Sequence, residues 1–354
     1  MKLLYFSPVN WNHIKQRPHF LAEYFADNSV EVTYFSRTPY LKPGCGKQEK
    51  INDHLSVCDI PVFPFALKLG CVEKFNNRRL KNLVGQGGYD VIVLGDPRLV
   101  DAVPAESRAL LVYDCMDKNP DFHAGKVRQM IAGKESELCR RAEKIVCSSN
   151  KLKEYLLENY SVEPEKVCVV RNAAADDFLS ESEEKHSVPA TDLLYVGTVD
   201  DWFDWQSVTE FAEKFPQKHI RIVGPVMSDL PSELPGNIEL YGKVPHPEVA
   251  RHIKSASLLV MPFKINPLIE AVDPVKLYEY LALGKRVLAP WWSELEYFKT
   301  NPHLSFYNGS KDFSEKASKL LEEPENHCEN PDYDFLSRNN WSTRGREFLS
   351  FIRR

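Results

Sequence analysis

The stretch that decides the expected fold is residues 273–290, which read DPVKLYEYLALGKRVLAP. Pro274 suits the first position of a helix, where its missing N–H costs nothing. The apolar residues after it recur at helical spacing, and Gly284 predicts the end of the helix. The apolar run at 287–289 then predicts a buried strand. We therefore expect one helix followed by one strand of a parallel sheet.

The start of this helix has the chemistry of an anion site. Free backbone N–H groups at a helix start favour negative charge, and here they lie beside Lys276. Glu279 follows one turn later, where its carboxylate could accept hydrogen bonds from the hydroxyls of a ribose. An ordinary surface helix with one lysine and one glutamate explains this stretch equally well.

Short apolar runs alternate with helical patterns along most of the chain. Such alternation specifies an α/β fold with doubly wound parallel sheets. Two series of strands are separated by a polar stretch at 176–191. We expect two Rossmann-like domains, at 1–175 and 176–340, and a terminal helix at 341–354 that packs back toward the first domain. The expected strands lie at 3–6, 31–35, 91–94, 110–113, 144–147 and 167–170, then at 193–196, 220–223, 238–241, 258–261 and 287–289.

The expected binding site follows from this architecture. Ligands of open α/β sheets bind beyond the carboxyl ends of the strands, so two such domains predict a site in the cleft between them. The chain contains no GxGxxG motif and no P-loop lysine motif. Nicotinamide-dinucleotide and P-loop chemistry are therefore disfavoured.

Charge and cysteine usage narrow the class of protein. Residues 1–175 carry 25 Lys and Arg against 21 Asp and Glu, whereas the remainder carries 20 against 29. This balance argues against a nucleic-acid partner and suits a first domain that meets an anionic membrane or phosphate-bearing acceptor, although random surface charge would also produce it. Eight scattered cysteines without metal-ligand spacing predict free thiols in a reducing cytoplasm and no metal site.

Several ordered motifs carry a resemblance to a known family. The most specific is Trp-x(4)-Gln-Arg-Pro-His, which begins at Trp11 and ends at His19. Further pieces are YDCMD at 113–117, VRNA at 170–173, YVGTVDDWFD at 195–204, YGKVPH at 241–246 and MPFK at 261–264. With these motifs the chain resembles the family 4-like GT-B glycosyltransferases of bacterial polysaccharide synthesis, and the teichuronic-acid type in particular.

The resemblance implies a GT-B fold and transfer of a sugar from a nucleoside-diphosphate sugar, with a UDP-sugar as the expected donor and no cofactor. The acceptor would be a glycan or a polyprenol-linked glycan. The residues that the resemblance or their position assigns to the donor are Glu279 for the ribose, Lys276 and Lys264 for the phosphates, Val244 and Pro245 for the base, and also Gly197 and Asp273. The family's paired glutamates would need an acid at position 271, where this chain has Ala271.

Candidate catalytic residues in the first domain are Arg17, Asp114 and Asp117. Arg17 starts a helix after the first strand, and the two aspartates are expected to follow a buried strand, where carboxylates can act on sugar hydroxyls. A surface salt bridge for Arg17, and helix caps or turns for the aspartates, are the structural alternatives. Turnover would then depend on hinge motion near Asn172 that closes the two domains.

The segment 63–84 mixes aromatic and aliphatic residues with lysines and arginines. Such a segment can lie on an anionic bilayer, although an ordinary helix surface explains it as well. If the acceptor is lipid-linked, we expect a cytoplasmic protein at the inner face of the plasma membrane. Two other functions remain open, a nucleotide-sugar 2-epimerase and a catalytically inactive scaffold that binds nucleotide sugars.

Overall fold

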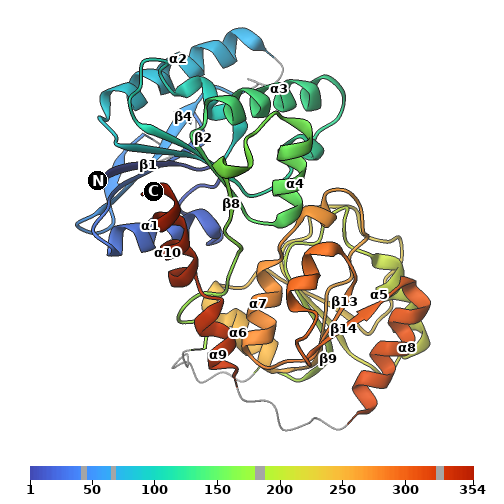
Figure 1. The fold of residues 1–354 in the computed structure, drawn as a ribbon. Coiled ribbons are helices and arrows are strands. Elements are labelled where there is room, and N and C mark those ends of the chain that lie inside the picture. The colour runs from blue at the N-terminus through green and yellow to red at the C-terminus, as the bar shows by residue number, and fades with distance from the viewer. Residues whose placement is uncertain (41–45, 65–68, 180–187, 324–330) are drawn as a thin grey trace. The chain divides into compact units, whose positions relative to one another are not determined.

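Two compact units make up the chain in the computed structural model (Figure 1). Unit 1 comprises Met1–Arg171 and Trp341–Arg354, and unit 2 comprises Asn172–Asn340. The structure describes residues 1–40, 46–64, 69–179, 188–323 and 331–354. The division falls slightly before the expected boundary at 175, because residues 172–175 bond to unit 2. The backbone N–H of Ala174, for example, donates to the carbonyl of Asn339 at 3.0 Å.

The strands of unit 1 form one sheet in the order β3-β4-β2-β1-β5-β6-β7-β8, parallel except for the β3–β4 pair. They are β1 (Lys2–Phe6), β2 (Glu31–Pro39), β3 (Gln48–Lys50), β4 (Leu55–Val62), β5 (Val91–Leu94), β6 (Leu110–Cys115), β7 (Lys144–Cys147) and β8 (Val167–Val169). The helices are α1 (Arg17–Asp27), α2 (Gly70–Gln86), α3 (Gly125–Arg141), α4 (Asn150–Asn159) and α10 (Trp341–Ile352). The short 3-10 turns are η1 (Pro97–Ala102), η2 (Asn119–Phe122) and η3 (Pro164–Lys166).

Unit 2 has a parallel sheet in the order β11-β10-β9-β12-β13-β14. Its strands are β9 (Thr191–Val196), β10 (Ile220–Val223), β11 (Ile238–Gly242), β12 (Ala256–Val260), β13 (Val287–Pro290) and β14 (Leu304–Tyr307). Its helices are α5 (Trp205–Lys214), α6 (His246–Lys254), α7 (Val275–Ala282), α8 (Gly309–Glu322) and α9 (Tyr333–Arg338), with the 3-10 turns η4 (Ile269–Ala271) and η5 (Ser293–Phe298).

The central strands are buried on both faces, which is why they read as unbroken apolar runs in the sequence. All four residues from Leu3 to Phe6 in β1 are closed to solvent, as are Val287, Leu288 and Ala289 in β13. The two doubly wound α/β sheets confirm the predicted fold class.

The C-terminal helix α10 completes unit 1 by packing on α1 (Figure 1). The ring of Phe348 lies 5.3 Å from that of Phe25, and Trp341 stacks on Phe20 at 5.1 Å. Gly345 allows this close approach, because a Cβ there would lie 2.2 Å from the ring of Tyr24. The last residues of the chain therefore belong to the core of the first unit.

Some elements differ from the expectation. Helix α7 begins at Val275 with Pro274 as its N-cap, one residue later than expected, and the N–H of Leu277 donates to the carbonyl of Pro274 at 3.0 Å. Strand β6 continues to Cys115, so Asp114 lies within the strand and not after it. Strands β3, β4 and β14 were not predicted from the sequence, because their exposed or partly exposed positions leave no unbroken apolar run.

The packing of α10 predicts a measurable cost. Phe348 is fully buried, so Phe348→Ala should lower the free energy of unfolding of unit 1 by about 3–5 kcal/mol through lost burial and a cavity. Ser350→Ala on the exposed face of the same helix is the matched control. Chemical denaturation followed by circular dichroism measures both variants, and equal effects would contradict the assignment of α10 to this core.

Candidate functional site

The expected donor residues lie at one edge of the sheet in unit 2. Gly197 directly follows β9, Lys264 follows β12, and α7 begins on the connection between β12 and β13. Because the strands are parallel, their carboxyl ends share the edge at which ligands of α/β sheets bind. Val244 and Pro245 follow the edge strand β11, and Pro245 is the N-cap of α6.

Lys276 in the first turn of α7 is the centre of this edge. Its Nζ donates to the hydroxyl of Tyr195 at 3.2 Å and lies 4.9 Å from the ring centres of both Tyr195 and Phe263. Burial lowers the pKa of Lys276 to about 8, while the charge of Glu279 acts in the opposite direction. Within the described ranges, no carboxylate lies within ion-pair distance of this ammonium. Lys276 is therefore a desolvated cation suited to an incoming anion.

Two glycines allow the chain to approach Lys276 closely. A Cβ at Gly197 would lie 2.7 Å from Nζ of Lys276, and a Cβ at Gly224 would lie 2.1 Å from the carbonyl oxygen of Gly197. Both glycines also have φ in the left-handed region, at 148° and 141°. Side chains at these positions would displace the ammonium or separate the ends of β9 and β10.

The two acids near α7 have different surroundings. Glu279 lies one turn after Lys276 and is 9% exposed. The carboxylate of Asp273 accepts from the N–H of Asn172 at 2.6 Å and from the hydroxyl of Tyr278 at 3.0 Å. The Nδ2 of Asn172 donates in turn to the carbonyl of Asp273 at 2.7 Å. Asp273 thus fixes the start of α7, which favours a positioning role over direct contact with a donor.

The remaining donor candidates, Lys264, Val244 and Pro245, differ in their surroundings and in their relation to Lys276. Lys264 is exposed, and its N–H donates to the carbonyl of Trp202 at 2.8 Å. The residue before it in the chain, Phe263, contacts Lys276, because the centre of the Phe263 ring lies 4.9 Å from Nζ of Lys276. Val244 is half-buried and Pro245 is exposed, and among the described residues no contact joins either of them to Lys276.

The sequence reading missed the aromatic part of this site. Tyr195 and Phe263 both contact the ammonium of Lys276, and the Tyr195 hydroxyl donates to the carbonyl of Thr198 at 2.8 Å. The sequence signal that could have identified these two residues is an aromatic residue near the end of β9 and another shortly after the end of β12. Phe203 and Trp205, in contrast, pack against each other, with ring centres 4.6 Å apart.

In unit 1, Arg17 and Asp114 form a buried ion pair. The Nη2 of Arg17 lies 2.9 Å from Asp114, whose carboxylate also accepts from the hydroxyl of Tyr5. The Nη1 of Arg17 donates to the carbonyl of Val170 at 2.8 Å. Arg17 is 4% exposed and Asp114 is closed to solvent. This geometry favours positioning roles for both residues over contact with a substrate.

The motif at 11–19 joins the loop after β1 to the start of α1. His19 is 2% exposed, and its Nδ1 accepts from the N–H of Gln16 at 3.0 Å, so it caps α1. Its other ring nitrogen, Nε2, lies 3.1 Å from the carbonyl of Asn10, and its ring contacts Trp11 at 5.2 Å. The motif therefore holds the loop after β1 against the start of α1, which delivers Arg17 to Asp114.

Asp117 is the candidate in unit 1 whose acid–base properties suit proton transfer. It lies two residues beyond the end of β6 and is half-buried. Burial raises the pKa of Asp117 to about 7, with Arg17 lowering it and Asp114 raising it further. A carboxyl that titrates near neutral pH can exchange protons with a reacting hydroxyl. Asp117 is therefore the strongest candidate for proton transfer in unit 1.

The described residues contain neither a metal-binding cluster nor a helix that could span a membrane. No three His, Cys, Asp or Glu side chains there gather so that they could hold a metal ion. No described helix is long and apolar enough to span a bilayer. Cysteines 71, 115, 139, 147 and 168 are free thiols, while positions 45 and 328 fall outside the described residues.

Comparisons with known proteins agree with this architecture. Residues 19–178 match the family model of Glycosyltransferase Family 4. Over 200 residues the chain is 26% identical to a putative teichuronic acid biosynthesis glycosyltransferase of Bacillus subtilis, a match that covers 50% of this chain and 49% of the relative. The match thus spans about half the length of that curated relative.

Solved structures match over nearly the whole chain. Sucrose-phosphate synthase from Thermosynechococcus elongatus matches with a TM-score of 0.75 and 12% identity, covering 99% of this chain and 98% of that one. Anabaena HepE, solved in complex with UDP and glucose, matches with a TM-score of 0.68 and 12% identity over 100% and 99% of the two chains. The predicted resemblance is thereby confirmed: the protein has the GT-B fold and is similar to family 4 glycosyltransferases.

Proposed function

We propose that the protein transfers a sugar from a nucleoside-diphosphate sugar, a UDP-sugar, to a glycan or polyprenol-linked acceptor in bacterial surface polysaccharide synthesis. The observation that carries the proposal is the partly buried ammonium of Lys276. It lies at the start of a helix and at the ligand-binding edge of the sheet, with no carboxylate partner in the described part of the chain. A diphosphate supplies the anion that such a group lacks.

The proposed donor chemistry needs stabilisation of a leaving diphosphate. Negative charge grows on the diphosphate as the bond to the sugar breaks, so groups that bind this charge act on the transition state. Lys276 and the first N–H groups of α7 would supply that binding, with Lys264 as a second cation. Because these groups can carry the charge, we propose that transfer needs no resident cofactor or metal.

The nucleoside would occupy the rest of the same edge. The carboxylate of Glu279 would accept hydrogen bonds from the ribose hydroxyls, and Val244 and Pro245 would contact the base. Gly197 would leave room for the phosphates beside Lys276. HepE, solved with UDP and glucose, and the teichuronic acid relative from Bacillus subtilis support a UDP-sugar and a polysaccharide pathway.

Unit 1 would handle the acceptor. We propose that Asp117 exchanges a proton with the acceptor hydroxyl, while Arg17 and Asp114 hold the end of β6 in place. The basic and aromatic segment 63–84, of which residues 65–68 lie outside the described residues, would contact the inner face of the plasma membrane from the cytoplasm. A nucleotide-sugar 2-epimerase and an inactive scaffold are separated from transfer by their products, because the first yields an epimer and the second yields none.

The experiment that tests the proposal is a UDP titration of wild type and Glu279→Ala. Loss of charge-assisted hydrogen bonds to the ribose should weaken binding by about 1.5–3 kcal/mol. Glu213→Ala, an exposed acid of α5, is the control. Calorimetry gives the affinities, and product analysis with UDP-sugars shows whether transfer occurs. A folded Glu279→Ala protein that binds UDP normally would remove the assignment of this edge to the donor.

Gly197→Ala tests the close approach at Lys276. A Cβ would lie 2.7 Å from Nζ, so the ammonium must move, and UDP affinity should fall at least about tenfold, the scale of one charged hydrogen bond. Gly236→Ala is the control, because a Cβ there meets nothing within 4 Å. Equal UDP affinities for the two variants, measured by calorimetry, would argue against a phosphate beside Gly197.

The role of Asp117 predicts a pH dependence. A general base works in its ionised form, so turnover should rise as pH increases through about 7, the pKa of this carboxyl. Asp117→Asn should abolish this rise of turnover with pH and lower kcat by about 10²–10⁴-fold. Asp121→Asn, a nearby carboxylate paired with Arg128, is the control. A wild-type kcat that stays flat from pH 6 to 8, roughly one unit either side of that pKa, would contradict the role.

A further inference from the structure

Two arginines in unit 1 converge on one buried carboxylate. The Nη2 of Arg37 and the Nη2 of Arg98 each lie 2.6 Å from Oδ2 of Asp96, and the Nε of Arg98 donates to both carboxylate oxygens at 3.0 Å. Asp96 is 1% exposed, whereas the arginine side chains are 24% and 26% exposed. One carboxylate thus holds two guanidinium groups, and both remain accessible from solvent.

The unequal lengths of strands β1 and β2 bring Arg37 and Arg98 together on Asp96. Strand β1 ends at Phe6, opposite Phe35, while β2 continues to Pro39 alongside β4. Arg37 therefore lies beyond the end of β1, and its side chain reaches Asp96, two residues past the end of β5. The pair occupies the carboxyl edge of the sheet, where α/β proteins bind ligands.

The donors of this pair are only partly used. In the described part of the chain, Asp96 is the one hydrogen-bond partner of the Arg37 side chain, through Nη2 alone. Arg98 uses Nε and Nη2 on Asp96. The Nε and Nη1 of Arg37 and the Nη1 of Arg98 can therefore donate to a further anion. A guanidinium pair with unused donors is the arrangement that binds phosphate oxygens.

Other charges nearby do not cancel the pair. Burial lowers the pKa of Arg37, and the charges of Asp96 and Glu73 oppose that effect. Glu73 forms no ion pair among the described residues. It lies in the first turn of α2, a helix that also carries Lys74, Arg78, Arg79 and Lys81. Asp59 on the adjacent strand β4 accepts from the hydroxyl of Ser36 and from Asn10. The surroundings of Arg37 and Arg98 thus stay favourable to an anion.

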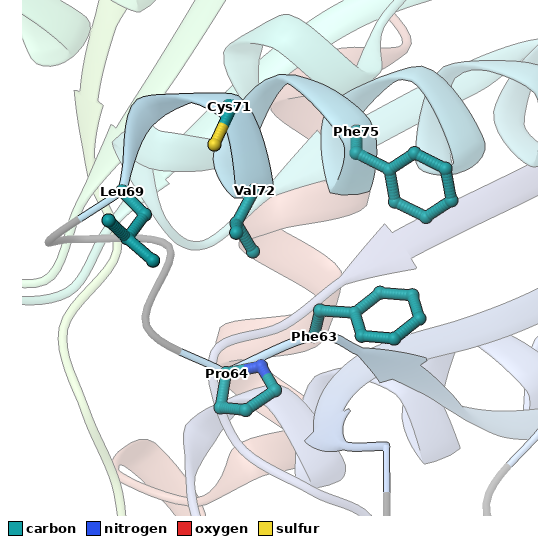
Figure 2. Close-up of a pocket in the computed structure, with 6 residues that line it drawn as sticks. All are labelled: Phe63, Pro64, Leu69, Cys71, Val72 and Phe75. Carbon is teal, nitrogen blue, oxygen red and sulfur yellow. The ribbon is translucent and has the colours of Figure 1, made fainter.

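An apolar groove lies next to this edge, between the end of β4 and the start of α2. Phe63, Pro64, Leu69, Cys71, Val72 and Phe75 line it, and Figure 2 shows Leu69 and Val72 pointing toward Pro64 and Phe63. Three of these side chains are strongly exposed, at 38% for Phe63, 50% for Leu69 and 52% for Phe75. The rings of Phe63 and Phe75 contact each other at 5.5 Å, and Tyr40 stacks on Phe63 at 4.8 Å.

Polar bonds hold this exposed groove in shape. Asn76 is 5% exposed, and its side-chain amide both donates to the carbonyl of Phe63 and accepts from its N–H, each at 3.0 Å. The Nη1 of Arg79 donates to the carbonyl of Pro61 at 3.1 Å. The aromatic rings therefore stay in place without being buried, as a preformed site for an apolar ligand requires.

The cationic pair and the groove are close together. Glu73 lies in the first turn of α2, next to the groove residue Val72, and its charge raises the pKa of both Arg37 and Arg98. A ligand with a phosphate at one end and a hydrocarbon chain at the other would meet both surfaces at once. A glycan alone would leave the groove empty, and a bare bilayer would not need two arginines set on a buried carboxylate.

We propose that Arg37 and Arg98 bind the phosphate of a prenyl-diphosphate-linked acceptor, whose hydrocarbon chain lies in the groove lined by Phe63, Leu69 and Phe75. The inference rests on the proposed function, because it names the acceptor of that transfer. It also gives the groove one occupant, a single lipid chain continuous with a charged head group.

The test uses the full chain, farnesyl diphosphate as the probe, and saturating UDP to block the donor site in unit 2. Calorimetry should show farnesyl diphosphate binding at least about tenfold more tightly than either inorganic pyrophosphate or farnesol, because only the first engages both surfaces. The paired change Arg37→Gln and Arg98→Gln should lower the affinity for farnesyl diphosphate at least about tenfold and leave farnesol binding unchanged. Leu69→Ser and Phe75→Ser should weaken farnesyl diphosphate and leave pyrophosphate unchanged.

Matched controls lie on the same helix. Arg78→Gln removes an exposed arginine outside the pair, and Leu83→Ser removes an exposed leucine outside the groove, so neither should change the affinity for farnesyl diphosphate. If the double arginine variant does not fold, Arg98→Lys replaces it. That variant keeps a cation beside Asp96 but loses the fork geometry, and at least about threefold weaker binding of farnesyl diphosphate is expected.

Three results would overturn the proposal. These are equal affinity for farnesyl diphosphate and farnesol, unchanged affinity in the arginine variants, or equal losses in Arg78→Gln. Binding to phosphatidylglycerol vesicles that depends on the groove but not on the arginine pair, without selective binding of farnesyl diphosphate, would assign the groove to the bilayer instead. Failure of wild type to bind UDP, in contrast, would remove the proposed donor site and leave the farnesyl diphosphate result standing.

Discussion

The partial burial of one ammonium group, that of Lys276, with no carboxylate partner among the described residues is the constraint on which the rest of unit 2 depends. Removing a charge from water is costly, and the lowered pKa of Lys276 reflects that cost. Glycines at 197 and 224, the two aromatic rings around Nζ and the anchoring of α7 by Asp273 all serve to hold this group at the edge of the sheet. A bound diphosphate would turn this destabilising feature into a source of affinity.

Unit 1 is organised around an ion pair that is fully satisfied. Arg17 and Asp114 are closed to solvent and use their hydrogen bonds on each other, on Tyr5 and on the carbonyl of Val170. Removing either partner would leave a buried charge uncompensated, which is strongly destabilising. The motif at 11–19 thus serves to orient the end of β6, and the residue it leaves available for chemistry is the half-buried Asp117.

The sequence predicted most of the fold because the central strands are buried on both faces. Runs such as residues 3–6, 91–94 and 145–147 are apolar throughout, and a parallel sheet between helices requires that pattern. Strand β4, which lies between β3 and β2, escaped prediction because several of its residues are half-exposed. The start of α7 was predicted to within one residue, since proline and glycine mark both of its ends.

The candidate sites were harder to predict, because they depend on contacts between distant parts of the chain. The sequence places Lys276 at a helix start, but its contacts with Tyr195 and Phe263 exist only once β9 and β12 are neighbours. The sequence placed Asp114 just after the end of strand β6. In the structure the strand continues through Asp114 to Cys115, and the carboxylate is buried. The convergence of Arg37 and Arg98 on Asp96 likewise follows from the unequal lengths of β1 and β2, which no local pattern reveals.

The most direct test of the central claim is proton uptake when UDP binds. At pH 8 a lysine with a pKa of about 8 is only partly protonated, whereas one that binds a diphosphate should be fully charged. Calorimetric titrations at this pH in buffers of different ionisation enthalpy should therefore show uptake of a fraction of a proton per UDP. The uptake should disappear near pH 6.5, roughly one and a half units below that pKa, where Lys276 is already charged. UDP binding at pH 8 with no proton uptake would contradict the assignment of the diphosphate to Lys276.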